Sequence, residues 1–160
     1  MDLRREKKRA IMRYAGYVAG TLGVGGLSAL LSRGGMEAFA HLKKPSFSPP
    51  GWVFPAAWTL LYILMAVSAA MIAGERTKQS RDALFTYCAQ LFVNFWWSIF
   101  FALRLRLTAF FWLLLLLVLA VIMAFRFGNI RPAAGKLNIP YLLWLVFAGV
   151  LNISVYILNK

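Results

Sequence analysis

The sequence predicts an all-α integral membrane protein, built as a bundle of five transmembrane helices. Hydrophobic residues make up 61% of the 160 residues and charged residues only 14%, against roughly 45–50% and about 25% in soluble domains. The apolar residues also gather in five runs of about 20 residues, the length that crosses the hydrocarbon layer of a bilayer. A chain of this length is expected to form one membrane domain, residues 1–160.

Five predicted spans follow one another along the chain. Short polar connectors separate most of them, and a short connector makes neighbouring helices antiparallel. The spans are expected at residues 11–31, 52–73, 83–103, 108–127 and 139–158.

The first span follows a basic N-terminal tail. It continues to about residue 31, which is too long for the apolar part of a cleavable signal peptide. We therefore expect a transmembrane helix that also acts as the targeting signal. Gly16 and Gly20 form a pair of small residues four apart, which allows two helices to approach closely. This contact is either within the bundle or between two copies of the chain.

The segment 32–51, between the first and second spans, is longer than the other connectors. It contains Pro45, Pro49 and Pro50, which cannot continue a helix. We expect either a structured loop or a cap over one mouth of the bundle.

The net charge of +13 lies in short basic clusters between the apolar runs. This pattern is typical of membrane loops in contact with lipids and argues against nucleic-acid binding. Twelve basic residues fall on the side of the N-terminus and six on the opposite side. In an inner or plasma membrane, the positive-inside rule therefore predicts a cytoplasmic N-terminus, with segment 32–51 and the C-terminus on the other side.

Ionisable groups suited to catalysis are scarce in the spans. The only histidine, His41, lies in segment 32–51, and Cys88 is the only cysteine. The acidic residues lie outside the spans or at their ends: Asp2, Glu6, Glu37, Glu75 and Asp82. This argues against a proton or ion pump, conventional acid–base catalysis and a metal site.

Aromatic and amide side chains instead recur at helical spacing inside three spans. Each face listed here lies on one side of its helix: Trp58, Tyr62 and Met65; Gln90, Asn94, Trp97 and Phe101; Trp144, Ala148, Leu151, Asn152 and Val155. Amides in a bilayer need hydrogen-bond partners, so these faces are expected to point inward. They indicate either the packing of bulky residues or a pocket in which indoles stack on a flat apolar ligand.

Three blocks of sequence resemble the TspO/MBR family of tryptophan-rich sensory and translocator proteins. They are residues 44–53 (KPSFSPPGWV) with Pro55, Trp58 and Tyr62; residues 90–97 (QLFVNFWW) with Phe100; and residues 140–148 (PYLLWLVFA) with Leu151 and Asn152. They occur in the order and spacing of the family.

The resemblance implies a five-helix bundle, often a homodimer, with a pocket capped by the first loop. The implied ligand is protoporphyrin IX or a related hydrophobic molecule, and no cofactor is implied. The implied ligand-binding residues are Trp58, Tyr62, Asn94, Trp97, Phe100, Trp144, Ala148 and Leu151. The implied loop or lid residues are Lys44, Pro45, Pro49, Pro50 and Trp52.

The sequence departs from the family in the lid, where Ala38, Phe39 and Phe47 replace tryptophan or tyrosine. The resemblance favours a binding or sensory protein for tetrapyrroles. Two alternatives are an enzyme that degrades porphyrin in light, with Trp58 and Trp144 as its catalytic residues, and a facilitated transporter of porphyrins or lipids.

Overall fold

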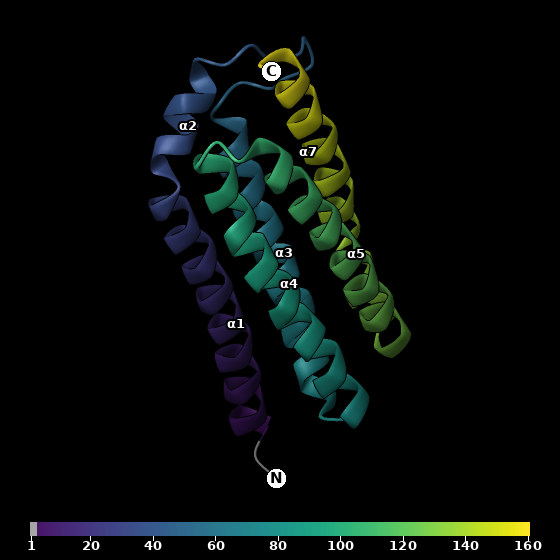
Figure 1. The fold of residues 1–160 in the computed structure, drawn as a ribbon. Helices are drawn as coiled ribbons and strands as arrows, with labels where there is room; N and C mark the ends of the chain where they lie inside the picture. The colour runs from purple at the N-terminus through teal and green to yellow at the C-terminus, as the bar shows by residue number, and fades with distance from the viewer. Residues whose placement is uncertain (1–2) are drawn as a thin grey trace.

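The computed structural model describes residues 3–160, apart from the side chains of Met36 and Ala38; Asp2 therefore lies outside the described residues. Within residues 3–160 the chain forms helices and no strands (Figure 1). The helices are α1 (Leu3–Leu31), α2 (Arg33–Ala40), α3 (Val53–Glu75), α4 (Lys78–Ala102), α5 (Arg106–Ile130), α6 (Pro132–Lys136) and α7 (Ile139–Leu158).

The fold class predicted from the sequence is confirmed. Helices α1, α3, α4, α5 and α7 (the last together with α6) are long and apolar enough to cross a membrane. The long helices extend beyond several predicted spans: α1 begins at Leu3 rather than at residue 11, and α4 begins at Lys78 rather than at residue 83. The length of an apolar run reflects the thickness of the bilayer, whereas the helix itself continues into water for as long as its residues favour helix formation.

The connection between α3 and α4 has only two residues. Arg76 takes the left-handed conformation with φ 53°, which ends α3. Thr77 then starts α4 with a capping box, in which its hydroxyl accepts from the backbone N–H of Ser80 and the Ser80 hydroxyl accepts from the backbone N–H of Thr77. This tight turn makes α3 and α4 antiparallel neighbours.

The segment expected to be a structured loop contains helix α2 and two proline turns. The backbone N–H of Ser48 donates to Pro45, and that of Val53 donates to Pro50. The backbone N–H and carbonyl of Lys43 both bond to the Asn159 amide, at 3.0 and 2.8 Å. The segment is therefore fastened to the end of α7 (Figure 1).

Helix α6 turns the chain back from α5 into α7. Its Gly135 lies against Gly128 of α5, where an added Cβ would be 2.7 Å from the Gly128 Cα. Pro132 and Pro140 lie in the first turns of α6 and α7, where proline interrupts no helical hydrogen bond.

Helix α3 occupies the middle of the bundle, in contact with α1, α4, α5, α6 and α7. Its Met65 and Ile72 are fully buried, as are Leu113, Leu116 and Met123 of α5. In contrast, Gly16 and Gly20 of α1 face away from the bundle: a Cβ added at either position would have no neighbour within 4 Å. Of the two interpretations of this pair, contact within the bundle is therefore wrong.

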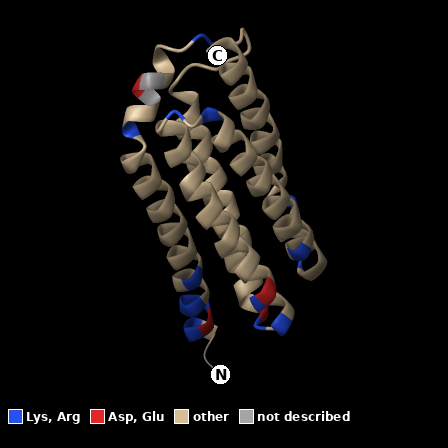
Figure 2. Cartoon of the chain, viewed as in Figure 1, with Lys and Arg blue, Asp and Glu red and all other residues tan. Residues whose placement is uncertain are grey.

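The charged residues lie mainly near the two ends of the bundle, and the long apolar stretches between them carry few (Figure 2). The N-terminal turns of α1 and the α3–α4 connection bring many basic residues to one end. At this end Arg126 of α5 donates to the Thr86 hydroxyl at 2.7 Å and to the Asp82 carbonyl. The opposite end holds α2, segment 41–52 and the C-terminus (Figure 1).

Candidate functional site

A cavity of about 240 Å³ lies near the α2 end of the bundle, enclosed by α1, α2, α3, α4 and α7. Its walls come from the C-terminal parts of α1, α4 and α7 and the N-terminal part of α3. No Asp, Glu, Lys, Arg or His is among the described residues that line it. The cavity is therefore suited to a hydrophobic molecule.

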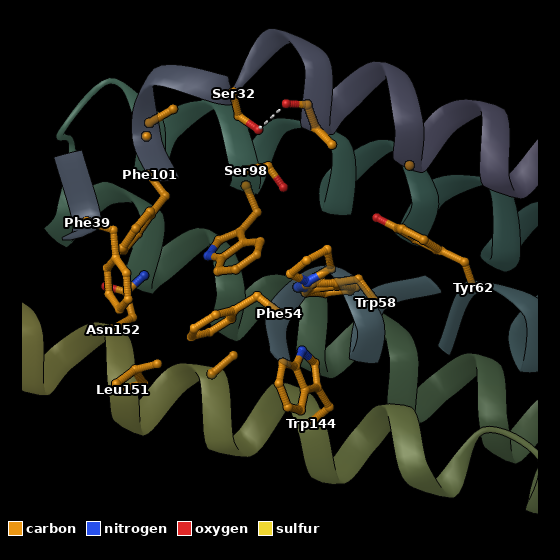
Figure 3. A pocket seen from close by; sticks show the side chains of 17 residues that line it. Ser32, Phe39, Phe54, Trp58, Tyr62, Ser98, Phe101, Trp144, Leu151 and Asn152 are labelled. Atoms are coloured by element: carbon orange, nitrogen blue, oxygen red, sulfur yellow. Dashed lines mark hydrogen bonds between the residues drawn. The ribbon is translucent and has the colours of Figure 1, made fainter. Parts of the chain in front are cut away.

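Six aromatic side chains from four helices line the cavity and contact one another in a closed circuit (Figure 3). We call these residues the aromatic cluster: Phe39, Phe54, Trp58, Trp97, Phe101 and Trp144. The distances between ring centroids are as follows: Trp58–Trp97 5.7 Å, Trp97–Phe101 6.1 Å, Phe101–Phe39 6.0 Å, Phe39–Phe54 5.6 Å, Phe54–Trp144 6.1 Å and Trp144–Trp58 6.4 Å. Tilted and edge-on pairs at these distances are favourable.

Next to the aromatic cluster, on the side away from α2, a chain of buried hydrogen bonds joins α3, α4 and α7. Tyr62 donates to the Asn94 amide oxygen at 3.2 Å, and the Asn94 amide nitrogen donates to the Tyr141 hydroxyl at 3.0 Å. Tyr141 in turn donates to Gln90 at 2.8 Å, and Gln90 donates to the sulfur of Met65. The amide nitrogen and the amide oxygen of both Asn94 and Gln90 therefore have hydrogen-bond partners, as an apolar interior requires.

Two glycines set the shape of the cavity walls. A Cβ at Gly25 of α1 would overlap the ring of Tyr62, so glycine allows this tyrosine to lie against α1. A Cβ at Gly35 of α2 would be 2.7 Å from the Cα of Ala102, so α2 approaches the end of α4 closely.

Several polar atoms facing this region have no partner among the described residues. The indole nitrogens of Trp97 and Trp144 are buried without an acceptor, and both amide atoms of Asn152 lack a hydrogen bond. All three residues line the cavity. The cavity therefore offers unused hydrogen-bonding groups in an otherwise apolar lining.

The structure brings six of the eight predicted ligand-binding residues to this cavity: Trp58, Tyr62, Trp97, Trp144, Ala148 and Leu151. Asn94 does not line it but lies beneath, bonded to Tyr62. Phe100 does not line it either. The turn of α4 that points Trp97 and Phe101 inward directs Phe100 toward α5, where its ring packs on Trp112 at 5.2 Å.

None of the predicted loop residues, Lys44, Pro45, Pro49, Pro50 and Trp52, lines the cavity. Phe39 and Gly35 of α2 close it instead. The Lys44 ammonium lies 5.1 Å from the centre of the Phe39 ring, and Trp52 is 71% exposed. The prolines shape the turns rather than the cavity wall.

Residues that the sequence prediction omitted include Phe39 and Phe54. Phe54 could have been found, because it precedes Trp58 by four residues on the same face of α3. Phe39 gives no such signal, since its position depends on how α2 folds back over the bundle.

The comparisons with known proteins agree with this architecture. A model of the TspO/MBR family matches residues 17–158. Protein CrtK of Rhodobacter capsulatus is 37% identical over 91% of this chain and 92% of its own length. The tryptophan-rich sensory protein of Cereibacter sphaeroides is 36% identical over 77% of each chain, and the translocator protein of Bos taurus is 38% identical over 80% of this chain and 79% of its own.

These matches cover nearly the whole bundle, including all the helices that line the cavity. The chain therefore belongs to the TspO/MBR family, as a multi-pass membrane protein with a sensory or ligand-binding role.

Proposed function

We propose that the chain is a membrane receptor for tetrapyrroles of the protoporphyrin IX type, with a sensory or regulatory role in porphyrin handling. The aromatic cluster is the observation that carries this proposal. Its indole and phenyl faces suit stacking on a flat, apolar macrocycle. The tetrapyrrole is a ligand in this proposal, and no resident cofactor is part of it.

The proposal assigns separate roles to the residues. Trp58, Trp97 and Trp144 contact the macrocycle, whereas Asn94 orients Tyr62 through their hydrogen bond. The propionates of a tetrapyrrole require charged partners, which the cavity lining lacks. They would therefore lie at the α2 end, within reach of the Lys44 ammonium over the Phe39 ring.

Titration of the purified protein with protoporphyrin IX in the dark, followed by tryptophan quenching, tests the proposal. We expect saturable binding of micromolar or higher affinity, weakened roughly tenfold in Trp144→Phe and in Asn94→Ala. Trp52→Phe is the matched control, because Trp52 is exposed and outside the cavity. Absence of saturable binding, or equal loss in the control, would contradict it.

Light-dependent degradation of the bound porphyrin is a second candidate. Trp58 and Trp144 both line the cavity and contact each other at 6.4 Å, so a bound macrocycle would touch both indoles. Illumination in air should bleach bound porphyrin in the wild type and not in the double variant Trp58→Phe, Trp144→Phe, provided that the variant still binds. Bleaching at the normal rate in the double variant would remove these residues as catalysts.

We also propose a homodimer formed through the open face of α1. This proposal combines the family resemblance with the glycines Gly16, Gly20 and Gly23, where an added Cβ would meet nothing in the bundle within 4 Å. Light scattering in detergent should give twice the chain mass for the wild type and the chain mass for Gly20→Leu. Val121→Leu, on an exposed position of α5, is the control. A Gly20→Leu protein that stays dimeric would exclude this face.

The proposed orientation has the N-terminus in the cytoplasm, because the basic residues concentrate at the N-terminal end (Figure 2). Single cysteines test it after Cys88→Ala. A membrane-impermeant maleimide should label Ser46→Cys, but not Gln79→Cys, on intact cells. Labelling of Gln79→Cys but not of Ser46→Cys would show the opposite orientation.

A further inference from the structure

The guanidinium of Arg13 lies in the contact between α1 and α3. A Cβ added at Gly74 of α3 would be 2.9 Å from its Nη2, 3.1 Å from its Cζ and 3.3 Å from its Nη1. The guanidinium therefore packs against the backbone of α3, and the glycine at position 74 leaves the space for it. The Nε of Arg13 is buried and has no acceptor among the described residues.

Arg13 differs in this respect from two other arginines at the same end of the bundle. Arg126 donates to the Thr86 hydroxyl and to a backbone carbonyl, and Arg131 lies 3.5 Å from the Glu75 carboxylate. In the part of the chain that the structure describes, Arg13 has neither a hydrogen bond nor a carboxylate partner. A cation that is partly removed from water is unfavourable without an anion. Because the residue is only half-buried, an anion from outside can reach its outer N–H groups.

The position of Arg13 along the bundle corresponds to the surface of the membrane. Its neighbour Gly74 lies in the last turn of α3, which ends at Glu75. Figure 2 shows Lys and Arg gathered at this end of the bundle. The acidic residues described at this end are Glu6, Glu75 and Asp82, and Glu75 is already paired. Basic residues at this level of a membrane protein attract anionic lipid headgroups.

The surface of α1 beside Arg13 carries a shallow hollow. Its lining consists of Lys7, Ala10, Ile11, Tyr14, Ala15 and Val18. The cation is thus at the N-terminal end of the hollow, and mainly apolar side chains follow it over about three helical turns. The Arg13 Cζ lies 5.6 Å from the centre of the Tyr14 ring, which connects the guanidinium to the hollow. A phospholipid has the same order of groups, a phosphate followed by an acyl chain, whereas a soluble phosphate would leave the apolar part unused.

We propose that Arg13 and Lys7 bind the phosphate of an anionic phospholipid, whose acyl chain lies in the hollow on α1. A guanidinium recognises phosphate through its charge and its paired N–H donors. A zwitterionic lipid carries the same phosphate but adds a cation, which the basic residues at this end repel. The site lies at the opposite end of the bundle from the aromatic cluster, so this inference does not depend on the proposed porphyrin receptor.

Native mass spectrometry of the protein in a neutral detergent tests the proposal. The probes are phosphatidylglycerol and phosphatidylcholine with the same acyl chains. The wild type should bind phosphatidylglycerol about tenfold more tightly, the effect of one charge-assisted interaction. In Arg13→Gln the two lipids should bind with affinities that agree within about twofold.

Arg81→Gln is the matched control, because it removes the same charge from an exposed position in the first turn of α4. Salt screens exposed charges, so this variant should keep the preference for phosphatidylglycerol within about twofold of the wild type. An equal loss in Arg81→Gln and Arg13→Gln would mean that the overall surface charge attracts the lipid, and would overturn the site.

A third probe separates a lipid from a soluble phosphate. Glycerol 3-phosphate at millimolar concentration should not displace phosphatidylglycerol, because it lacks the acyl chain that the hollow takes. Displacement by glycerol 3-phosphate, or equal wild-type affinities for the two lipids, would overturn the proposal.

Thermal unfolding gives a second readout. Phosphatidylglycerol should raise the midpoint of the wild type by roughly 2–4 °C relative to phosphatidylcholine, and should not do so in Arg13→Gln. In phosphatidylcholine alone, Arg13→Gln should unfold at or above the wild-type midpoint, because it removes an unpaired cation. A lower midpoint there would show that Arg13 has a partner within the protein and would overturn the inference.

Discussion

Tyr62 lies against the backbone of α1 at Gly25, and a methyl group there would overlap its ring. Gly25→Ala should therefore displace Tyr62, break its bond to Asn94 and weaken ligand binding roughly tenfold, with a cost of about 1–3 kcal/mol from overpacking. Gly26→Ala is the control, since its Cβ meets nothing within 4 Å. Both changes gain the same helix propensity, so their difference in affinity and unfolding midpoint isolates the overlap. Equal behaviour of the two variants would contradict this explanation.

The hydroxyl of Tyr141 makes two buried hydrogen bonds, and that of Tyr62 makes one. Tyr141→Phe leaves one unpaired atom on Gln90 and one on Asn94, and each costs about 1–3 kcal/mol. Tyr62→Phe leaves an unpaired atom on Asn94 alone. Tyr141→Phe should therefore destabilise the protein about twice as much in denaturing-detergent titrations. A larger effect of Tyr62→Phe would mean that the network is not the source of stability.

At the residue scale, helical spacing was enough to predict which side chains face the interior of the bundle. Trp58, Tyr62, Trp97 and Trp144 were placed on inward faces by their spacing, and they line the cavity. Spacing does not determine depth or the neighbouring helix. For this reason Asn94, on the same face as Trp97, lies in the hydrogen-bond network below the cavity.

At the scale of elements, α6 packs closely against α5 through two glycines. A Cβ on Gly135 would be 2.7 Å from the Cα and 3.0 Å from the N of Gly128, whereas a Cβ on Gly128 would be 3.8 Å from the Gly135 Cα. Gly135→Ala should thus cost about 1–3 kcal/mol, while Gly128→Ala should be neutral or slightly stabilising. Unfolding in mixed detergent compares the two. Equal stabilities would show that α6 moves freely from α5.

Elements were predictable in proportion to their apolar length. The five long helices are recognisable in the sequence because each needs an apolar run long enough to cross the bilayer. Helices α2 and α6 have eight and five residues and lie in segments with proline and glycine, so no apolar run marks them. Gly35 and Gly135 show why they nevertheless form: each packs backbone against backbone of a neighbouring long helix. That contact is tertiary and has no signature in the local sequence.

At the scale of the whole molecule, the cavity and the basic N-terminal end lie at opposite ends of the bundle (Figures 1 and 2). The α2 end is closed by Phe39, with ring contacts to Phe54 and Phe101. The enclosed volume of about 240 Å³ is below that of typical ligand pockets. A macrocycle therefore requires this end to open, and opening must separate contacts of the aromatic cluster.

The hydrogen bonds between segment 41–52 and α7 are contacts that we expect such an opening to break. Lys43 is held by two hydrogen bonds to the Asn159 amide, at 3.0 and 2.8 Å. Asn159→Ala removes both without touching the cavity lining, so it lowers the barrier to opening more than it changes the bound state. We expect association and dissociation rates of porphyrin to rise together by roughly tenfold, with affinity altered less than about threefold. Stopped-flow quenching measures both rates, and Ser154→Ala, whose hydroxyl bonds only within α7, is the control. Faster dissociation alone would show that segment 41–52 contacts the ligand instead of gating its passage.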